Sequence, residues 1–480
     1  MTKQNNRELL GIAPISSLIP KFALPAIISG LVGAFYNIAD QIFIGQSIGV
    51  LGNATTNVLF PLTTISTGIA YLIGIGGSAR FNLSLGAKNE EKAGFSVGNA
   101  LTLILLVSLT LVVLCNLLLS PILQLSGATA AVMPLATEYG RITILGLPFF
   151  MSAMAASQLV RADANPQFSM FILMIGSIIN LILDPIFIFG FNMGIAGAAW
   201  ATVVGQAVSF ILSIYYFRYR FHSIKLSWRY TRLHWQTVKK ILGLGITPFN
   251  AFISMMLVQI VLNNTLTHYG AQSKYGSEIP LAVVGIISKI NYIFVAINIG
   301  MIQGAQPIVG FNYGAKKYDR VLNILRYIVI RSLIIGSISF ICFQVFPRQL
   351  ASIFGGHSEL FFEFAEQYFR IFMVMCIFNG LLPVTGNFFT AIGKPIYGVM
   401  TSLSRRILTL IPLLLILPHF LGIRGVLYAG PIADSVAIIL AVILLTHRTR
   451  IIRKKLHEPK ENHTSEEETS TNMTIFTPSE

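Results

Sequence analysis

Charged residues are scarce in this sequence. Asp, Glu, Lys and Arg make up 11% of its 480 residues, against roughly 25% in an average soluble protein. Hydrophobic residues make up 54%, and the mean hydropathy is +0.71. A chain of this length could enclose several cores, but it lacks the charged surface that would keep them apart in water, so most of it must face lipid. The composition therefore excludes a soluble globular protein.

Cysteine is also scarce, and the motifs of several enzyme classes are missing. The three cysteines, Cys115, Cys342 and Cys376, lie within apolar stretches and lack the spacing of a metal or disulfide site. The sequence contains no D-D-x-x-D, no H-E-x-x-H and no P-loop. An acyl or prenyl transferase and an ATP-driven pump are therefore not supported. We expect no enzymatic activity, no cofactor and no metal other than a possible Na⁺.

What the sequence has in abundance is apolar runs, each longer than the roughly 20 residues needed to cross a bilayer. The first run is too long for a cleavable signal sequence and follows a polar start, so it is interpreted as the first span. These runs predict an all-α membrane protein with twelve transmembrane helices. They fall at about 18–46, 54–78, 93–120, 130–155, 168–190, 195–217, 237–265, 279–310, 318–346, 359–384, 395–418 and 423–446.

The formal net charge of +15 suggests nucleic acid or an anionic surface as a partner. When the 34 basic residues are assigned to the predicted loops, 24 fall at the two termini and on alternate loops. The opposite loops hold three, Lys274, Arg348 and Arg424. By the positive-inside rule both termini are cytoplasmic. The basic segment 218–240 therefore indicates topology and contact with anionic lipid, and we expect no nucleic-acid partner.

An internal repeat divides the chain. Leu-Gly-Ala-Lys at 85–88 returns as Tyr-Gly-Ala-Lys at 313–316, and Gly-Ile-Ala-Gly at 194–197 returns as Gly-Ile-Arg-Gly at 422–425, both at an offset of 228. Asn165-Pro166 returns as Lys394-Pro395, within one residue of that offset. An even number of spans separates the equivalents, so the repeat is parallel, about an axis along the membrane normal. We expect two six-helix lobes flanking a V-shaped cleft, at 1–217 and 237–447, with a basic cytoplasmic loop at 218–236 and a polar tail at 448–480, disordered from 456 onward.

Only three of the 19 carboxylates lie well inside the apolar runs: Asp40, Asp184 and Asp434. Ionisable groups at membrane depth are costly and are functional candidates by default. From a rise of 1.5 Å per residue, Asp40 and Asp184 lie roughly 28 and 24 Å from the cytoplasmic side, and Thr202 lies roughly 10 Å from the outer side. All three are therefore predicted in the outer half of the membrane.

The neighbours of these residues predict a polar cavity in the first half. Asn180 shares a helix face with Asp184, and Gln206 shares one with Thr202, because each pair is four residues apart. Pro185 frees a backbone carbonyl one turn earlier. Two carboxylates in such a pocket cannot both ionise cheaply, so we expect at least one to carry a proton or the pair to hold a cation. A purely structural, hydrogen-bonded role is the alternative.

The first span contains a possible hinge. Pro25 allows a kink in that helix, and Gly30 and Gly33 allow close packing. Protonation of Asp40 could then be linked to bending.

The second half differs from the first. The repeat places Leu413, or Pro412 beside it, at the position of Asp184, and Asp434 at that of Gln206. Asp434 and Lys289 both lie roughly 15 Å from the outer ends of their helices. We therefore predict a buried ion pair, with Arg331 as the alternative partner, in either a structural or a coupling role.

Some aromatic, Met and polar residues are candidates to line an adaptable cavity for varied apolar substrates, although most such side chains pack in cores or face lipid. The candidates are Tyr36, Asn37, Tyr139, Phe149, Met151, Met154, Gln206 and Met255.

The twelve spans, the Gly-Ala-Lys loops, Tyr-Asn-Ile-Ala-Asp-Gln at 36–41 and Asn-Leu-Ile-Leu-Asp-Pro-Ile-Phe-Ile-Phe-Gly at 180–190 resemble the multidrug and toxic compound extrusion (MATE) family, in its bacterial DinF-like and MepA-like branch. The resemblance spans about residues 14–447 and implies drug efflux driven by inward flow of H⁺ or Na⁺. It implies a cation site in the first lobe at Asp40, Asn180, Asp184 and Thr202. Lys289 stands where related chains carry a Glu, which argues against a second cation site.

The sequence thus predicts a monomeric multidrug antiporter of the bacterial plasma membrane that exports amphiphilic and cationic drugs by alternating access. A flippase for a lipid or lipid-linked precursor is the main alternative. A passive channel fits poorly with two repeated lobes and broken helices.

Overall fold

The computed structural model describes residues 5–352 and 358–457, so most of the predicted disordered tail lies outside the described residues. Helices form nearly all of this part, and it contains no strand. Eleven helices are long and apolar enough to cross a membrane. A twelfth span is a bent pair, Met133–Leu145 and Leu147–Ala162, with 50° between its halves. The prediction of an all-α membrane protein is confirmed.

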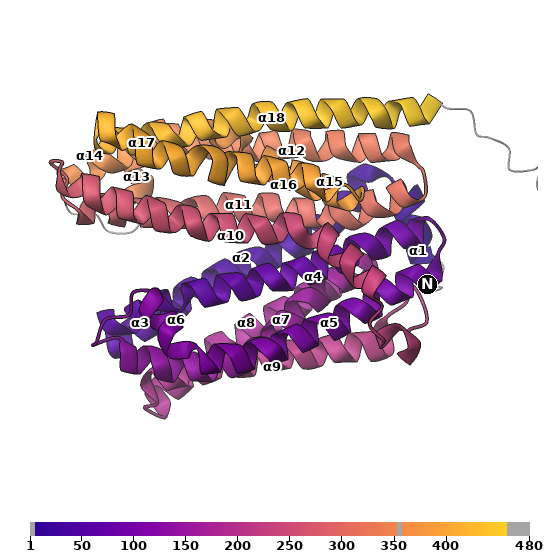
Figure 1. Cartoon of the computed structure of the whole chain (residues 1–480), viewed down its shortest axis with the longest axis horizontal. Helices are drawn as coiled ribbons and strands as arrows, with labels where there is room; N and C mark the ends of the chain where they lie inside the picture. The colour runs from indigo at the N-terminus through magenta and orange to yellow at the C-terminus, as the bar shows by residue number, and fades with distance from the viewer. Residues whose placement is uncertain (1–4, 353–357, 458–480) are drawn as a thin grey trace, which may run out of the picture.

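The first lobe contains the helices up to residue 220 (Figure 1). Their bounds are α1 (Asn5–Ile12), α2 (Ile15–Ile48), α3 (Val50–Val58), α4 (Phe60–Gly86), α5 (Glu90–Leu117), α6 (Leu119–Leu125), α7 (Met133–Ala162), α8 (Pro166–Pro185), the π-helical turn η1 (Ile186–Gly190), α9 (Gly194–Tyr215) and the π-helical turn η2 (Tyr216–Arg220).

A 3₁₀ turn, η3 (Trp228–Thr231), lies in the loop between the lobes, and the second lobe follows. Its helices are α10 (Trp235–Ala271), α11 (Glu278–Gly314), α12 (Tyr318–Val345), α13 (Pro347–Ser352), α14 (Glu359–Gln367), η4 (Tyr368–Phe372), η5 (Val374–Phe378), α15 (Leu381–Ala391), α16 (Pro395–Leu403), η6 (Ser404–Leu410), α17 (Ile411–Leu421) and α18 (Ile423–His457). The last helix therefore continues ten residues into the predicted tail.

The backbone repeats between the two lobes. Lys88 and Lys316, 228 residues apart, both adopt a left-handed conformation, with φ of 57° and 58°. Gly194 and Gly422, at the same offset, have φ of 56° and 57°. Left-handed φ is costly for a lysine, so its recurrence at equivalent helix ends indicates one structural unit used twice.

The lobes meet in the half of the molecule that carries the termini. A Cβ added at Gly86 would lie 2.1 Å from the carbonyl oxygen of Phe311, and one added at Gly314 would lie 2.2 Å from that of Leu83. The offset of 228 exchanges these two contacts, so they are related by the pseudo-two-fold axis. Only glycine permits backbones to approach this closely.

Farther from the termini the lobes separate. Gly30 of α2 still lies against Ala296 of α11, where an added Cβ would be 3.8 Å from the alanine Cβ. An added Cβ at Gly33 or Gly285, on the same helices beyond this contact, would meet no heavy atom within 4 Å. The ribbons of the lobes accordingly diverge from the right of Figure 1 toward the left.

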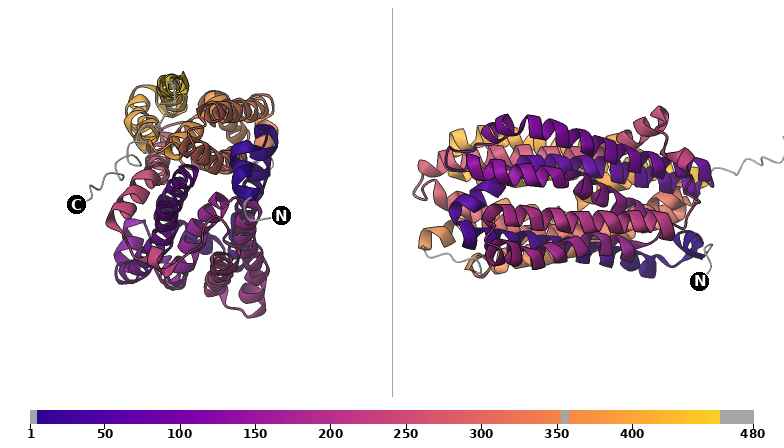
Figure 2. Two further views of the ribbon diagram at one scale, coloured as in Figure 1. Left: turned by 90° about the vertical axis from the view of Figure 1, so that its right-hand side faces the viewer. Right: turned by 90° about the horizontal axis from the view of Figure 1, so that it is seen from below.

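The helix α2 belongs to both lobes. Its first turns, with Leu18, Ile19 and Phe22, are buried in a core built mainly from α11, α12 and α15 of the second lobe. Its far end, at Ile44, is buried against α9 and η1 of the first lobe. The chain's indigo start lies against the orange-brown helices in the end view (Figure 2, left). The helix is continuous through Pro20 and Pro25.

Candidate functional site

Four polar residues predicted from the sequence come together in the first lobe. The Asn180 side-chain amide of α8 donates to Oδ1 of Asp184 (3.3 Å) and to the Thr202 hydroxyl of α9 (3.0 Å). Asp40 of α2 lies close enough to Asp184 for the two carboxyl groups to hydrogen-bond. Asp184 is fully buried and Asn180 nearly so. The four side chains thus form one cluster.

Two tyrosines complete the cluster. Tyr36 of α2 and Tyr139 of α7 both lie near Thr202 and near the carboxyl groups of Asp40 and Asp184. The sequence analysis placed these tyrosines in a substrate cavity. The structure places them at the carboxyl pair.

Glycines set the distance between the helices that carry this cluster. A Cβ on Gly205 of α9 would lie 2.4 Å from the carbonyl oxygen of Gly176 of α8. The two helices therefore touch through their backbones one turn from the Asn180–Thr202 hydrogen bond. Beyond Asp184 and Pro185, α8 widens into the π-helical turn η1, a feature that often marks functional sites.

The chemistry of this cluster is that of a proton or cation site. Asp40 Oδ1, Asn180 Oδ1 and Asp184 Oδ2 are buried and have no hydrogen-bond partner within the described residues. Two adjoining carboxylates in a low-dielectric pocket cannot both keep their charge unless something compensates it. A shared proton or a hard cation held by these oxygens would satisfy both the charge and the unpaired atoms.

The structure separates the other predicted cavity residues. Asn37 and Met255 are exposed, on α2 and α10. Met154 packs against the first-lobe core, and the Phe149 ring contacts Phe210. Gln206 lies against Gly146 of α7.

One cavity prediction is wrong. Met151 is fully buried inside the first-lobe core, where its side chain packs against other apolar groups rather than lining a cavity.

The predicted ion pair of the second lobe is also wrong in its partner. Asp434 of α18 pairs with Arg405 of η6, and Lys289 and Arg331 are exposed elsewhere. Arg331 stacks over the ring of Tyr327, 5.2 Å from its centroid. The segments η6 and α17 pack directly on α18, so a long Arg side chain reaches Asp434, whereas Lys289 lies on the face of α11 that is turned toward the first lobe.

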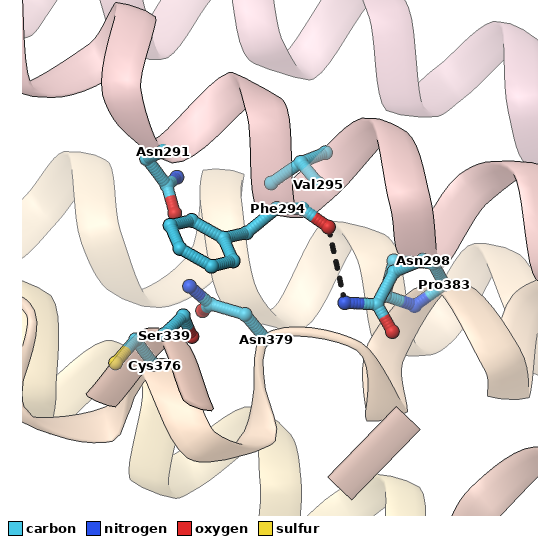
Figure 3. Close-up of a pocket in the computed structure, with 8 residues that line it drawn as sticks. All are labelled: Asn291, Phe294, Val295, Asn298, Ser339, Cys376, Asn379 and Pro383. Carbon is cyan, nitrogen blue, oxygen red and sulfur yellow. Dashed lines mark hydrogen bonds between the residues drawn. The ribbon is translucent and has the colours of Figure 1, made fainter. Parts of the chain in front are cut away.

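A polar pocket that the sequence analysis missed lies inside the second lobe (Figure 3). Its volume is about 10 Å³, room for one water molecule. Asn298 donates to the Phe294 carbonyl (3.2 Å) and accepts from Ser332 (2.8 Å). No carboxylate of the described residues lines it, so it lacks the charge of the first-lobe cluster. The lining residues are Asn291, Phe294, Val295, Asn298, Ser339, Cys376, Asn379 and Pro383.

A buried arginine links the lobes near the termini. Arg161 of α7 is 2% exposed and donates to Gln303 of α11 at 2.7 Å. The sequence analysis counted Arg161 as a loop residue of the cytoplasmic side. Arg161 lies six residues after the predicted apolar run at 130–155, and the helix α7 continues through it to Ala162.

Comparison with known proteins agrees with this architecture. The MatE family model matches residues 25–186 and 250–416, more than half of the chain. A probable multidrug resistance protein, YoeA of Bacillus subtilis, is 26% identical over 433 residues, covering 87% of this chain and 91% of YoeA. The multidrug export protein MepA of Staphylococcus aureus is 24% identical over 453 residues, covering 93% and 97%.

Solved structures show the same fold. The MATE multidrug transporter DinF-BH, determined in complex with rhodamine 6G, is 34% identical with a TM-score of 0.83, covering 90% of this chain and 95% of that one. An outward-facing MATE transporter of the MOP superfamily is 22% identical with a TM-score of 0.85, covering 93% and 98%.

Up to twelve membrane spans within the described residues, in two repeated lobes, together with these relatives identify a multi-pass membrane transporter rather than an enzyme. The chain belongs to the MATE family, in its DinF-like branch, and is a transporter of the multidrug efflux type.

Proposed function

We propose that the chain is an antiporter that exports amphiphilic drugs, cationic ones included, in exchange for H⁺ or Na⁺ taken up at Asp40 and Asp184. The observation that carries this proposal is the position of the carboxyl pair. Asp40 lies on α2, whose first turns are part of the second-lobe core. A change of charge at Asp40 therefore acts on a helix that both lobes share.

With both termini in the cytoplasm, the contacts between the lobes close the cytoplasmic half, and the state described is outward-facing. The bias of basic residues toward the terminal side supports this orientation. The exposed Trp228 and Trp235 of the basic inter-lobe loop fit the aromatic belt at a membrane surface. The family's bacterial members support placement in a bacterial plasma membrane.

Cation uptake is coupled to drug export through the two states of the carboxyl cluster, with and without a bound cation. A proton or Na⁺ from outside neutralises the carboxyl pair, which removes the repulsion between Asp40 and Asp184 and lets α2 settle against α8 and α9. A bound drug can drive or oppose this change only through different affinities for the two states. The inward-facing state must break the Arg161–Gln303 hydrogen bond and the glycine contacts. Because one chain supplies both lobes, a monomer suffices.

Variants of the carboxyl pair test this proposal. Asp40→Asn and Asp184→Asn each remove one charge at constant shape, and each is expected to abolish drug resistance and drug-induced proton movement. Asp319→Asn, at the exposed first turn of α12, is the matched control and should keep both. Full resistance in both cluster variants, at equal membrane expression, would refute the site.

The coupling ion is decided in liposomes. A proton gradient and a Na⁺ gradient are imposed separately while efflux of rhodamine 6G is followed. Transport with only one gradient identifies the ion, and transport with neither rules out secondary antiport.

The alternative function is that of a lipid flippase, and the observation in its favour is Lys289, a cation that an anionic headgroup could contact. The same liposomes with a fluorescent phospholipid test it. If dithionite reduces a larger fraction of the label in vesicles that contain the protein than in protein-free vesicles, the flippase is favoured.

A further inference from the structure

One face of α11 turns toward the first lobe over most of its length. Ala296 and Gly300 mark this face, because they contact Gly30 and Ile27 of α2. At about 100° per residue, Lys289 lies about 20° from the direction of Ala296, seven residues on, and about 20° from that of Gly300, eleven residues on. Lys289 therefore lies on the face of α11 that meets the other lobe, two turns beyond the contact between Ala296 and Gly30.

The exposure of α11 agrees with this placement. Gly285, Lys289 and Tyr292 are all exposed, and all belong to the stripe that ends in Ala296. An added Cβ at Gly285 would meet no heavy atom within 4 Å. Lys289 is 11 residues from the start of α11, roughly 16 Å along the helix. Its exposed side chain thus faces the space between the lobes at mid-membrane depth.

The helices across this space carry uncharged polar groups at the corresponding positions. On α2, Asn37 and Gln41 lie about 20° from the direction of Gly30. On α10, Gln259 and Asn263 lie about 20° from the direction of Phe252, and the Gln259 amide donates to Asn263 at 2.8 Å. These amides can donate to a ligand oxygen as well as accept.

Aromatic rings form the floor of the same space. Tyr71 of α4 stacks on Phe252 of α10, with ring centroids 5.3 Å apart and planes 11° apart. Tyr292 of α11 lies on the side of Tyr71. The floor thus offers flat apolar surface one turn below Lys289.

The carboxyl pair of the first lobe and Lys289 of the second lobe do not face each other. Asp40 lies about 80° around α2 from the direction of Gly30, turned into the first lobe toward Asp184. The carboxyl pair is therefore not on the stripe that faces Lys289. Within the described ranges Lys289 forms no ion pair. It is the only charged residue among those named above on the stripes of α2, α10 and α11.

We propose that the cleft contains a binding site for amphiphiles that carry an anionic group, with Lys289 contacting that group and the aromatic floor holding a planar ring. The inference rests on the proposed efflux function and adds to it a preference for anionic or zwitterionic compounds over cationic ones. The physical basis is the unpaired cation in a space between membrane helices, where attraction to an anion is stronger than in water and repulsion of a cation is stronger as well.

Two dyes that share a ring system and differ in one carboxylate test the effect of an anionic group on binding. Rhodamine 6G is a cationic ethyl ester, and its free acid, rhodamine 19, has the same ring system with a carboxylate in place of the ester. The dissociation constants of both are measured by fluorescence anisotropy on the purified full chain, and their transport is followed in liposomes under the driving gradient. The acid is expected to bind about five to ten times more tightly than the ester.

Three variants assign the preference to Lys289. Lys289→Gln should bring the ratio of the two dissociation constants close to one, because it removes both the attraction of the acid and the repulsion of the ester. Lys289→Arg should keep the preference for the acid and shows that the position tolerates substitution. Lys274→Gln removes a cation that is paired with Glu363 in an exposed ion pair and should leave the ratio as it is.

The remaining outcomes separate failure of the anion site from failure of the proposed efflux function. Equal affinities in the unaltered chain, or an unchanged ratio in Lys289→Gln, would overturn the anion site. Gradient-driven transport of the ester but not of the acid would also overturn it and leave drug efflux standing. Transport of neither dye would overturn efflux itself. Scrambling of an anionic phospholipid, without transport of the acid, would assign the lysine to a headgroup instead.

Discussion

At the scale of single residues, the ion pair Arg405–Asp434 has a structural role that can be tested. Asp434 is 7% exposed and Arg405 lies on the π-helical segment η6, which packs on α18. Asp434→Leu alone strands the guanidinium and is expected to lower the stability by about 3 kcal/mol, whereas the double variant with Arg405→Met should recover most of this. Thermal unfolding in detergent measures both.

Transport distinguishes the structural role from a coupling role. If the pair is structural, the double variant transports rhodamine dyes at close to the unaltered rate. A stable double variant without transport would assign Asp434 to coupling instead.

Among single residues, the first-lobe cluster could be predicted from the sequence, whereas the partner of Asp434 could not. The positions of Asp40, Asn180, Asp184 and Thr202 could be predicted because helix periodicity and depth place them on neighbouring faces. The partner of Asp434 could not be predicted in the same way. Lys289 was chosen as the partner because it lies at the same membrane depth as Asp434. The helix that packs beside α18, and the face it turns toward Asp434, are determined only when the whole lobe is assembled.

At the scale of helices, the close contact of α8 and α9 should control the carboxyl cluster. Gly205→Ala brings a methyl group to 2.4 Å from the Gly176 carbonyl and must push the helices apart. We expect a loss of about 1–3 kcal/mol in stability and impaired drug-induced proton movement, because the Asn180–Thr202 hydrogen bond lengthens. Unfolding temperature and transport in liposomes are the measurements.

The control for this substitution lies in the same lobe. At Gly190 in η1, an added Cβ meets no heavy atom within 4 Å, so Gly190→Ala should change neither quantity. Equal effects of the two substitutions would show that loss of glycine flexibility, and not the contact, is responsible.

Hydropathy predicts the number of membrane spans but not the breaks within them. Twelve spans and their repeat follow from apolar length and from loop motifs, which are local properties. The 50° bend of α7 at Gly146, and the division of the tenth span into α14, η4, η5 and α15, were not predicted. Gly146 faces Gln206, and the break near Asn379 borders the polar pocket. The bend of α7 lies next to Pro148, whose ring and missing N–H interrupt the helical hydrogen bonds, so the sequence did carry a signal for it. The break near Asn379 depends on neighbouring helices that supply polar contacts.

At the scale of the whole molecule, alternating access requires α2 and α11 to part. Gly30 and Ala296 form a contact between α2 and α11 near the point where the lobes separate, with an expected Cβ–Cβ distance of 3.8 Å, which suits a disulfide. Gly30→Cys with Ala296→Cys, in a chain whose three natural cysteines are replaced, is therefore expected to cross-link on oxidation and to stop transport. Reduction with dithiothreitol should restore the rate, and each single cysteine variant should be insensitive to oxidant. Dye binding should survive in the cross-linked form, because the cleft stays open to the side opposite the termini. Undiminished transport after complete cross-linking, judged by a mobility shift, would mean that this contact persists through the cycle and that the lobes do not rock about it.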